Sequence, residues 1–361
     1  MSQMQHRICR VQRGVVKGLL LLVGLFVGLP SVAIQFEINY VDSPGLGFLD
    51  PQYGPQRRLG LEAATLEFER LYGWNFVQSG GSRLMQIEVS ELVDPTNRTL
   101  GEASSPSHYL AYQPGFNLTN VFASKLLLDF DANGAAPDAT LKINFSQPFE
   151  IDPSAPVSNL KYDFRSVVLH EFTHWLGFYT TIVSDETTRQ FNWNNDQWSV
   201  FDSYLTDKNG LPVINPQTFL LDQNVWLPAH NTGCSSTGGS EGVYFAGPNA
   251  VATYGGPVPL FSRWANGVGA SHVDGNCNPD MSTWLMDAGV APGSAAHGWT
   301  DVELAMLADL GYRASPVSPI PEPETYALLA VGLILVVWQV RRRRPCVTGA
   351  DRPAHDCGSA A

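Results

Sequence analysis

Alternating apolar and polar positions predict strands in three separate parts of the chain. Segment 34–42 (IQFEINYVD) alternates as an edge or half-buried strand does, and segments 83–92 and 139–146 have strand-like patterns as well. Segment 56–73 has a different period, and we expect it to form a helix that ends at Gly73. Its apolar residues recur at helical spacing: Leu61, Ala64, Phe68 and Leu71.

Segment 161–178 (KYDFRSVVLHEFTHWLGF) is the second predicted helix. Asp163 can cap its N-terminus, and apolar side chains supply a face for packing: Phe164, Val167, Val168 and Phe172. A short helix is expected to open at 201–205. From about 210 to 275 the chain is rich in Gly, Pro, Asn and Ser, which is typical of irregular, loop-dominated structure.

Segment 300–312 (TDVELAMLADLGY) is the third predicted helix. Thr300 and Glu303 have the spacing of a capping box, in which each side chain accepts a hydrogen bond from the backbone of the other residue. Gly311 is the expected C-terminal stop. The Pro-rich residues that follow, 315–320, indicate a linker after the folded domain.

Composition and charge fit a folded globular protein and exclude one class of partner. Of the 361 residues, 44% are apolar and 16% are charged, which suits a globular domain with an ample core. Four of the 22 basic residues lie in 1–33, and five lie in 322–361 together with four of the 34 acidic residues. The body, 34–321, therefore carries a net charge of −17. Such a surface repels nucleic acid, so we expect no nucleic-acid partner.

The first 33 residues have the organisation of a secretory signal peptide. Four basic residues precede the apolar run GLLLLVGLFVGL, and the small residues Ser31-Val32-Ala33 follow it. We expect cleavage after Ala33. The alternative is a retained membrane anchor, although the apolar run is shorter than a full membrane span.

Two cysteines, Cys234 and Cys277, lie in the exported body. An oxidising compartment favours a disulfide between them, and two free buried thiols are the alternative. Residues 129–138 (DFDANGAAPD) resemble the start of a calcium-binding loop. The twelfth position, where such a loop has a bidentate Glu, is Thr140. An Asx-rich turn between two strands is therefore the favoured interpretation.

The sequence His170-Glu171-Phe-Thr-His174 predicts a zinc site on the second helix. Two histidines four residues apart project from the same helical face and can bind one zinc ion. Glu171 is rotated from His170 by about 100° around the helix axis, so it is not expected to bind the metal with them. It can instead hold a water molecule at the metal and take its proton as a general base during attack on a carbonyl carbon.

A zinc site needs a third protein ligand. The compact metzincin pattern places it six residues after the second histidine, beyond a glycine, and here Gly177 is followed by Thr180 at that position. A hydroxyl is a poor zinc ligand, so we expect the ligand elsewhere. The downstream histidines are candidates: His230, His272 and His297. A downstream Glu on a second helix is a further alternative, but no suitable helix follows His174 closely.

Residues 160–312 resemble the leishmanolysin family of metzincins. In that family an insertion separates the HExxHxxG helix from the third histidine, and a Met-turn and a helix ending in Asp-Leu-Gly-aromatic follow. The resemblance implies that His272 is the third zinc ligand and Leu285-Met286 the Met-turn. Asp309-Leu310-Gly311-Tyr312 would end the closing helix.

Residues 321–344 contain Pro321-Glu322-Pro323, a mostly apolar run and four arginines, and residues 345–361 follow as a cytoplasmic tail. This organisation resembles the PEP-CTERM sorting signal of Gram-negative bacteria. The resemblance implies a transmembrane helix with the body outside, an exosortase-type sorting enzyme as partner, and transient anchoring in the inner membrane. A plain single-pass anchor is the alternative. The tail is longer than such signals usually carry.

Together these features predict a secreted or surface zinc metalloendopeptidase with an α+β, metzincin-like domain at 34–314. A mixed sheet and the active-site helix would lie above a loop-rich C-terminal subdomain. Protein or peptide substrates are implied by the resemblance, because spacing alone indicates only a hydrolytic zinc site. Two alternatives are a non-catalytic exported surface or matrix protein that retains the fold, and a zinc hydrolase acting on other substrates.

Overall fold

The structure is a computed structural model of the whole chain, and it divides into two units, Met1–Ala314 and Ser315–Ala361. It describes residues 34–72, 84–96, 99–184, 191–192, 196–226, 242–262 and 269–312. The signal peptide, the predicted C-terminal membrane helix, His230 and Cys234 lie outside these residues. Within the described ranges, helices are too short or too polar for any of them to cross a bilayer.

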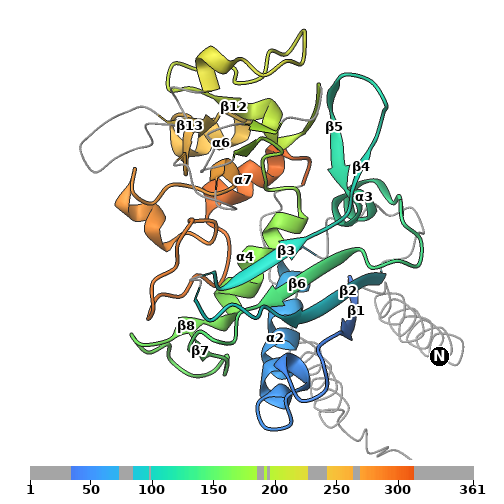
Figure 1. Cartoon of the computed structure of the whole chain (residues 1–361). Helices are drawn as coiled ribbons and strands as arrows, with labels where there is room; N and C mark the ends of the chain where they lie inside the picture. Colours follow the sequence, from blue (N-terminus) through green and yellow to red (C-terminus); the bar gives the residue numbers. More distant parts are fainter. Residues whose placement is uncertain are drawn as a thin grey trace, which may run out of the picture. The chain divides into compact units, whose positions relative to one another are not determined.

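A four-stranded mixed sheet forms the first half of the domain, with strand order β1-β2-β6-β3 (Figure 1). The strands β1, β2 and β6 are parallel, and β3 joins β6 antiparallel as the strand at the opposite end of the sheet. Their bounds are Gln35–Tyr40 for β1, Leu84–Glu91 for β2, Gly101–Ser104 for β3 and Ala139–Ile143 for β6. The three strands expected from alternation are confirmed, and β1 is an edge strand.

Two helices pack beside this sheet and contribute to its core. Helix α2, Gly54–Tyr72, contacts helix α4, Phe164–Trp175, and α4 also contacts β3 (Figure 1). Phe172 of α4 stacks on Trp175 with ring centroids 4.3 Å apart and meets Phe68 of α2 edge-on at 5.4 Å. Buried aromatic pairs of this kind stabilise a core beyond their area, so the apolar side of α4 is fixed against the domain.

The predicted helix at 161–178 is correct in its centre but too long at both ends. Asp163 is the N-cap and accepts a hydrogen bond from the Ser166 backbone, while Tyr162–Asp163 pair as strand β8 with β7, Phe149–Glu150. At the other end Gly177 has a φ of 87°, a conformation that side chains with a Cβ adopt rarely. The helix ends at Trp175, two residues before the glycine that follows the second histidine.

Smaller sheets and helices complete the described part of this unit. They are η1 Gly47–Leu49, β4 Ser107–Tyr109, β5 Gly115–Asn120, α3 Val121–Leu128, β9 Val183–Ser184, β10 Phe191–Asn192, β11 Gln197–Ser199, η3 Phe201–Tyr204, η4 Gly269–Ser271 and η5 Pro279–Thr283. The strands β11, β5 and β4 form one sheet, and β9 pairs with β10. The short helix expected at 201–205 is the 3-10 helix η3.

The expectation of loop-dominated structure at 210–275 is partly wrong. A sheet runs through this region in the order β12-β13-β14, with bounds Leu205–Thr206, Val243–Phe245 and Val258–Leu260. Helix α6, Pro248–Tyr254, packs against α7, Asp301–Asp309. These strands have two or three residues each, too few for alternation to mark them, and their pairing stabilises them instead.

The candidate calcium loop folds as an Asx turn with an ammonium group beside it. Asp131 accepts hydrogen bonds from the backbone of Asn133 and Gly134. The buried Lys125 places its Nζ 3.2 Å from Asp131 and 2.9 Å from Asp138. A lysine therefore supplies the positive charge next to these carboxylates. The expected Asx turn is present, but it joins helix α3 to strand β6 and not two strands. Taken together, the described residues form an α+β fold with several separate sheets.

Candidate metal centre

Two histidines of helix α4 and one histidine distant in the sequence meet at one place. His170, His174 and His272 each offer a ring nitrogen, and these nitrogens all lie within 4.8 Å of one another. The Nε2 atoms of His170 and His272 are 3.1 Å apart. Two nitrogens bound to one tetrahedral zinc ion would be separated by about 3.3 Å, given zinc–nitrogen distances near 2.0–2.1 Å. The donor set and its spacing therefore fit zinc.

The outer nitrogen of each helix histidine is bound to a backbone carbonyl. Nδ1 of His170 lies 2.7 Å from the carbonyl oxygen of Leu285, and Nδ1 of His174 lies 2.8 Å from that of Phe178. A carbonyl oxygen only accepts, so Nδ1 carries the hydrogen in both rings. Each Nε2 is then an unprotonated lone-pair donor, which is the form that a metal requires.

Burial keeps the two helix imidazoles neutral. It lowers the pKa of His170, against a smaller opposing effect of the hydrogen bond to Leu285. It lowers the pKa of His174 to about 3, and the neighbouring His170 adds to this effect. His272 is itself buried, with 7% of its surface exposed. The two helix imidazoles are therefore available to a cation without first losing a proton.

Thr180, at the third-ligand position of the compact metzincin pattern, forms hydrogen bonds within the protein. Thr180 donates its hydroxyl to Asp202 at 2.6 Å, and its backbone N–H donates to the Ser271 hydroxyl at 3.0 Å. Asp202 is buried and also accepts hydrogen bonds from Thr181 and Ser199. The chain after Gly177 is thus attached directly to the residue before His272. Through this hydrogen bond, Thr180 positions the loop that carries His272.

His272 is held between two further backbone segments. Its carbonyl accepts from Phe261, and the next residue, Val273, donates to the carbonyl of Met286 at 2.9 Å. Met286 is fully buried, and the residue before it supplies the carbonyl that binds His170. The backbone carbonyls of the Leu285-Met286 turn therefore bind His170 and the residue that follows His272.

His297 belongs to a different contact. Its Nε2 lies 2.7 Å from Asp163, the N-cap of α4, and its other ring nitrogen contacts Arg165. It is not among the histidines that group at the candidate centre. His230 lies outside the described residues. The structure therefore groups His272, and not His297, with the helix pair.

Glu171 lies buried against the edge strand β3. It is 7% exposed, and burial raises its pKa to about 8, with a further rise from the carboxylate of Glu102 and a lowering by the Ala103 backbone N–H. A Cβ on Gly101 would lie 3.0 Å from the Glu171 side chain, so a larger residue at 101 would require that side chain to shift. The sequence pattern predicts no strand at Gly101–Ser104, so neither Gly101 nor Ala103 is expected near the site from sequence alone.

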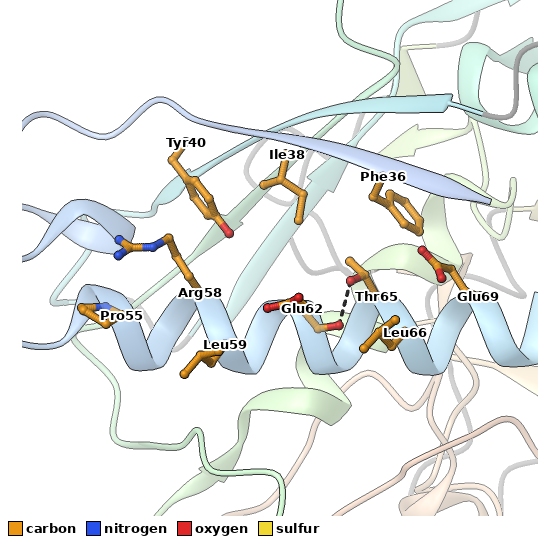
Figure 2. A pocket seen from close by; sticks show the side chains of 10 residues that line it. All are labelled: Phe36, Ile38, Tyr40, Pro55, Arg58, Leu59, Glu62, Thr65, Leu66 and Glu69. Atoms are coloured by element: carbon orange, nitrogen blue, oxygen red, sulfur yellow. Dashed lines mark hydrogen bonds between the residues drawn. The ribbon is translucent and has the colours of Figure 1, made fainter. Parts of the chain in front are cut away.

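A separate groove lies between β1 and α2. Figure 2 shows Phe36, Ile38 and Tyr40 of β1 directed toward the helix. None of the three histidines lines it. The groove is therefore distinct from the candidate centre.

Residues 319–344 match the model of the PEP-CTERM protein-sorting motif. The chain carries a PEP-CTERM sorting signal. The motif implies export and membrane-associated sorting, with an exosortase-type enzyme as partner. No curated protein and no solved structure matches the chain.

The PEP-CTERM signal predicts a shortened mature chain. The exported protein should end near Pro321-Glu322-Pro323, because sorting of such chains is expected to remove the apolar run and the arginines behind it. Intact mass measurement of the protein recovered from the cell surface or medium would show the new C-terminus. A full-length C-terminus on exported protein would favour the plain single-pass anchor.

A disulfide is expected between the two cysteines of the exported body, and the structure describes one of them. Cys277 is disulfide-bonded. Its expected partner, Cys234, lies outside the described residues, so the Cys234–Cys277 pairing stays a prediction. A disulfide at Cys277 restrains the segment between His272 and the Leu285-Met286 turn.

Proposed function

We propose that this chain is an exported zinc-dependent metallopeptidase with a metzincin-like site. The observation that supports it is the convergence of three imidazoles at one place, with the buried Glu171 on the same helix as two of them. His170, His174 and His272 would hold the ion. When bound, zinc would polarise a substrate carbonyl and make water more acidic. Three protein ligands leave a fourth position for these molecules, as catalytic zinc sites do.

Glu171 is the residue proposed to move the proton. It projects from the same helix as two ligands yet makes its contacts with β3, so it can act as a base without occupying the metal. Its raised pKa shows that the site stabilises the neutral acid when no cation is near. A carboxylate that readily holds a proton can accept one from water and give it to the departing amine.

Strand β3 supports peptides as the substrate class. It ends its sheet, and the Ala103 N–H donates to Glu171. The open edge of β3 therefore faces the proposed base. An extended peptide that pairs with such an edge is held by main-chain hydrogen bonds. This pairing would bring its carbonyl groups past Glu171.

Metal removal tests the proposed function. The purified exported protein should contain about one zinc ion per chain and cleave unfolded protein substrates such as casein. Dialysis against 1,10-phenanthroline should reduce hydrolysis to background, and one equivalent of zinc should restore it. Elemental analysis and gel-based hydrolysis assays provide the measurements.

Two other results would point to the alternatives. Zinc-loaded protein that cleaves none of a broad panel of peptides would favour a non-catalytic surface or matrix protein. Cleavage of esters or other amides without cleavage of peptides would favour a different hydrolase. The first result leaves the metal centre intact, so metal content and activity need to be measured on the same sample.

A further inference from the structure

One peptide group lies between a ligand histidine and a buried carboxylate. The Leu285 carbonyl accepts from His170 Nδ1 at 2.7 Å. The N–H of the same peptide group, which belongs to Met286, donates to Oε1 of Glu303 at 2.7 Å. A carboxylate, one amide and one imidazole are thus joined in a continuous line of hydrogen bonds.

Glu303 is held in place by the start of helix α7. Its second oxygen, Oε2, accepts from the Thr300 backbone at 2.7 Å and lies 2.9 Å from the Thr300 hydroxyl. The side chain is fully buried. Burial raises the pKa of Glu303 to about 7, and the hydrogen bonds from Thr300 and Met286 oppose this effect. Both oxygens accept from backbone N–H groups, so the ionised carboxylate fits its surroundings.

The amide can transmit the charge because its atoms are conjugated. A negative group at the N–H end increases the electron density on the carbonyl oxygen of the same planar unit. Hydrogen bonds in a chain polarise one another in this way. The Leu285 carbonyl then accepts more strongly from His170, which fixes the ring orientation and makes Nε2 a better metal donor.

The second helix histidine provides an internal comparison. His174 also donates Nδ1 to a carbonyl, that of Phe178. The N–H of that peptide group, on Tyr179, donates to the carbonyl of Gly177 at 2.9 Å. The N–H of the peptide group bound to His174 therefore donates to a neutral carbonyl, whereas the N–H of the peptide group bound to His170 donates to a carboxylate.

We propose that Glu303 is a positioning residue of the metal centre, which acts on His170 through the Leu285–Met286 peptide and increases zinc affinity. This inference rests on the metal site of the proposed function and not on its peptidase activity. The role differs from helix capping alone, because capping uses Oε2 and the connection to His170 uses Oε1.

The experiment compares Glu303→Gln with Thr300→Val in the full exported protein at pH 8. Both changes disturb the capping box, but only Glu303→Gln removes the charge that reaches His170. Zinc affinity is measured by competition with a chromophoric chelator. We expect Glu303→Gln to weaken zinc binding by about 10- to 100-fold, as loss of an outer partner of a metal ligand typically does. Thr300→Val should lower the melting temperature and leave zinc affinity unchanged.

A second readout uses metal-free protein. Long-range ¹H–¹⁵N spectra of the imidazoles should show that Glu303→Gln moves His170, but not His174, away from the pure Nδ1–H tautomer. Equal losses of zinc affinity in both variants, in proportion to their losses of stability, would show that Glu303 only caps α7. Unchanged zinc affinity in folded Glu303→Gln protein would also overturn the proposal.

Wild-type protein supplies the test where the glutamine variant does not fold. The Met286 amide proton should lie far downfield and should shift when zinc binds, because it belongs to the peptide group that links Glu303 to His170. The Tyr179 amide is the matched reference and should shift less. Equal responses of the two amides would contradict the proposal. A wild-type chain that binds no zinc would remove the metal centre itself, whereas zinc binding without peptidase activity would leave this inference standing.

Discussion

Glu171→Gln protein should bind zinc normally and lose peptide hydrolysis by about 10²- to 10⁴-fold, the range that general acid–base groups contribute. Glutamine keeps the size of the side chain and can still accept the Ala103 N–H through its amide oxygen. It cannot take a proton from water. The loss should therefore appear in kcat with little change in zinc content.

The matched control is Glu67→Gln. Glu67 lies on α2 and pairs with Arg70, at 2.6 Å, away from the histidines. Its replacement should leave both zinc content and hydrolysis unchanged. Full hydrolysis by zinc-loaded Glu171→Gln protein would show that another group is the base, and loss of zinc from that variant would show that Glu171 holds the metal.

His272→Ala protein should lose zinc. Removal of a residue that hydrogen-bonds to a metal ligand already lowers metal affinity by about 10- to 100-fold. Removal of a ligand itself should therefore lower zinc affinity by more than about 100-fold. Two histidines on one helix leave the site incomplete. Metal content after dialysis against a weak chelator would show the difference, and hydrolysis should fall with it.

Two control variants test the assignment of this ligand. His297→Ala also deletes an imidazole, but one that contacts Asp163. Thr180→Ala removes the hydroxyl that binds Asp202 and should reduce stability without emptying the site. If His297→Ala protein lost its zinc while His272→Ala protein kept it, the third ligand would be misassigned.

The sequence predicts the helix that carries the candidate site well, for physical reasons. Asp163, the apolar face and Gly177 are local signals, and local signals determine where a helix begins and ends. The paired histidines need only the helical repeat. The third ligand is different, because nothing in the spacing distinguishes His272 from His297. The choice between them depended on the order of motifs in a resembling family.

Other parts of the site were beyond sequence reasoning because they depend on tertiary pairing. Glu303 is recognisable as the partner of Thr300, but its other oxygen, Oε1, accepts from Met286, 17 residues away, and no pattern connects these two residues. Likewise, strands β13 and β14 are too short to show a period. The approach of β3 to Glu171 depends on how α4 packs against the sheet.

The candidate site takes its third histidine from a distant loop, which the Thr180–Ser271 hydrogen bond attaches to the end of α4. This origin determines when the site becomes complete. His170 and His272 are 102 residues apart, whereas a ligand at position 180 would close a segment of about ten. Closing the longer segment costs about 2 kcal/mol more chain entropy. An unfolded chain, as it crosses the membrane, would therefore hold zinc weakly. Hydrolytic capacity would arise only after the last loop has docked, outside the compartment where the chain is made.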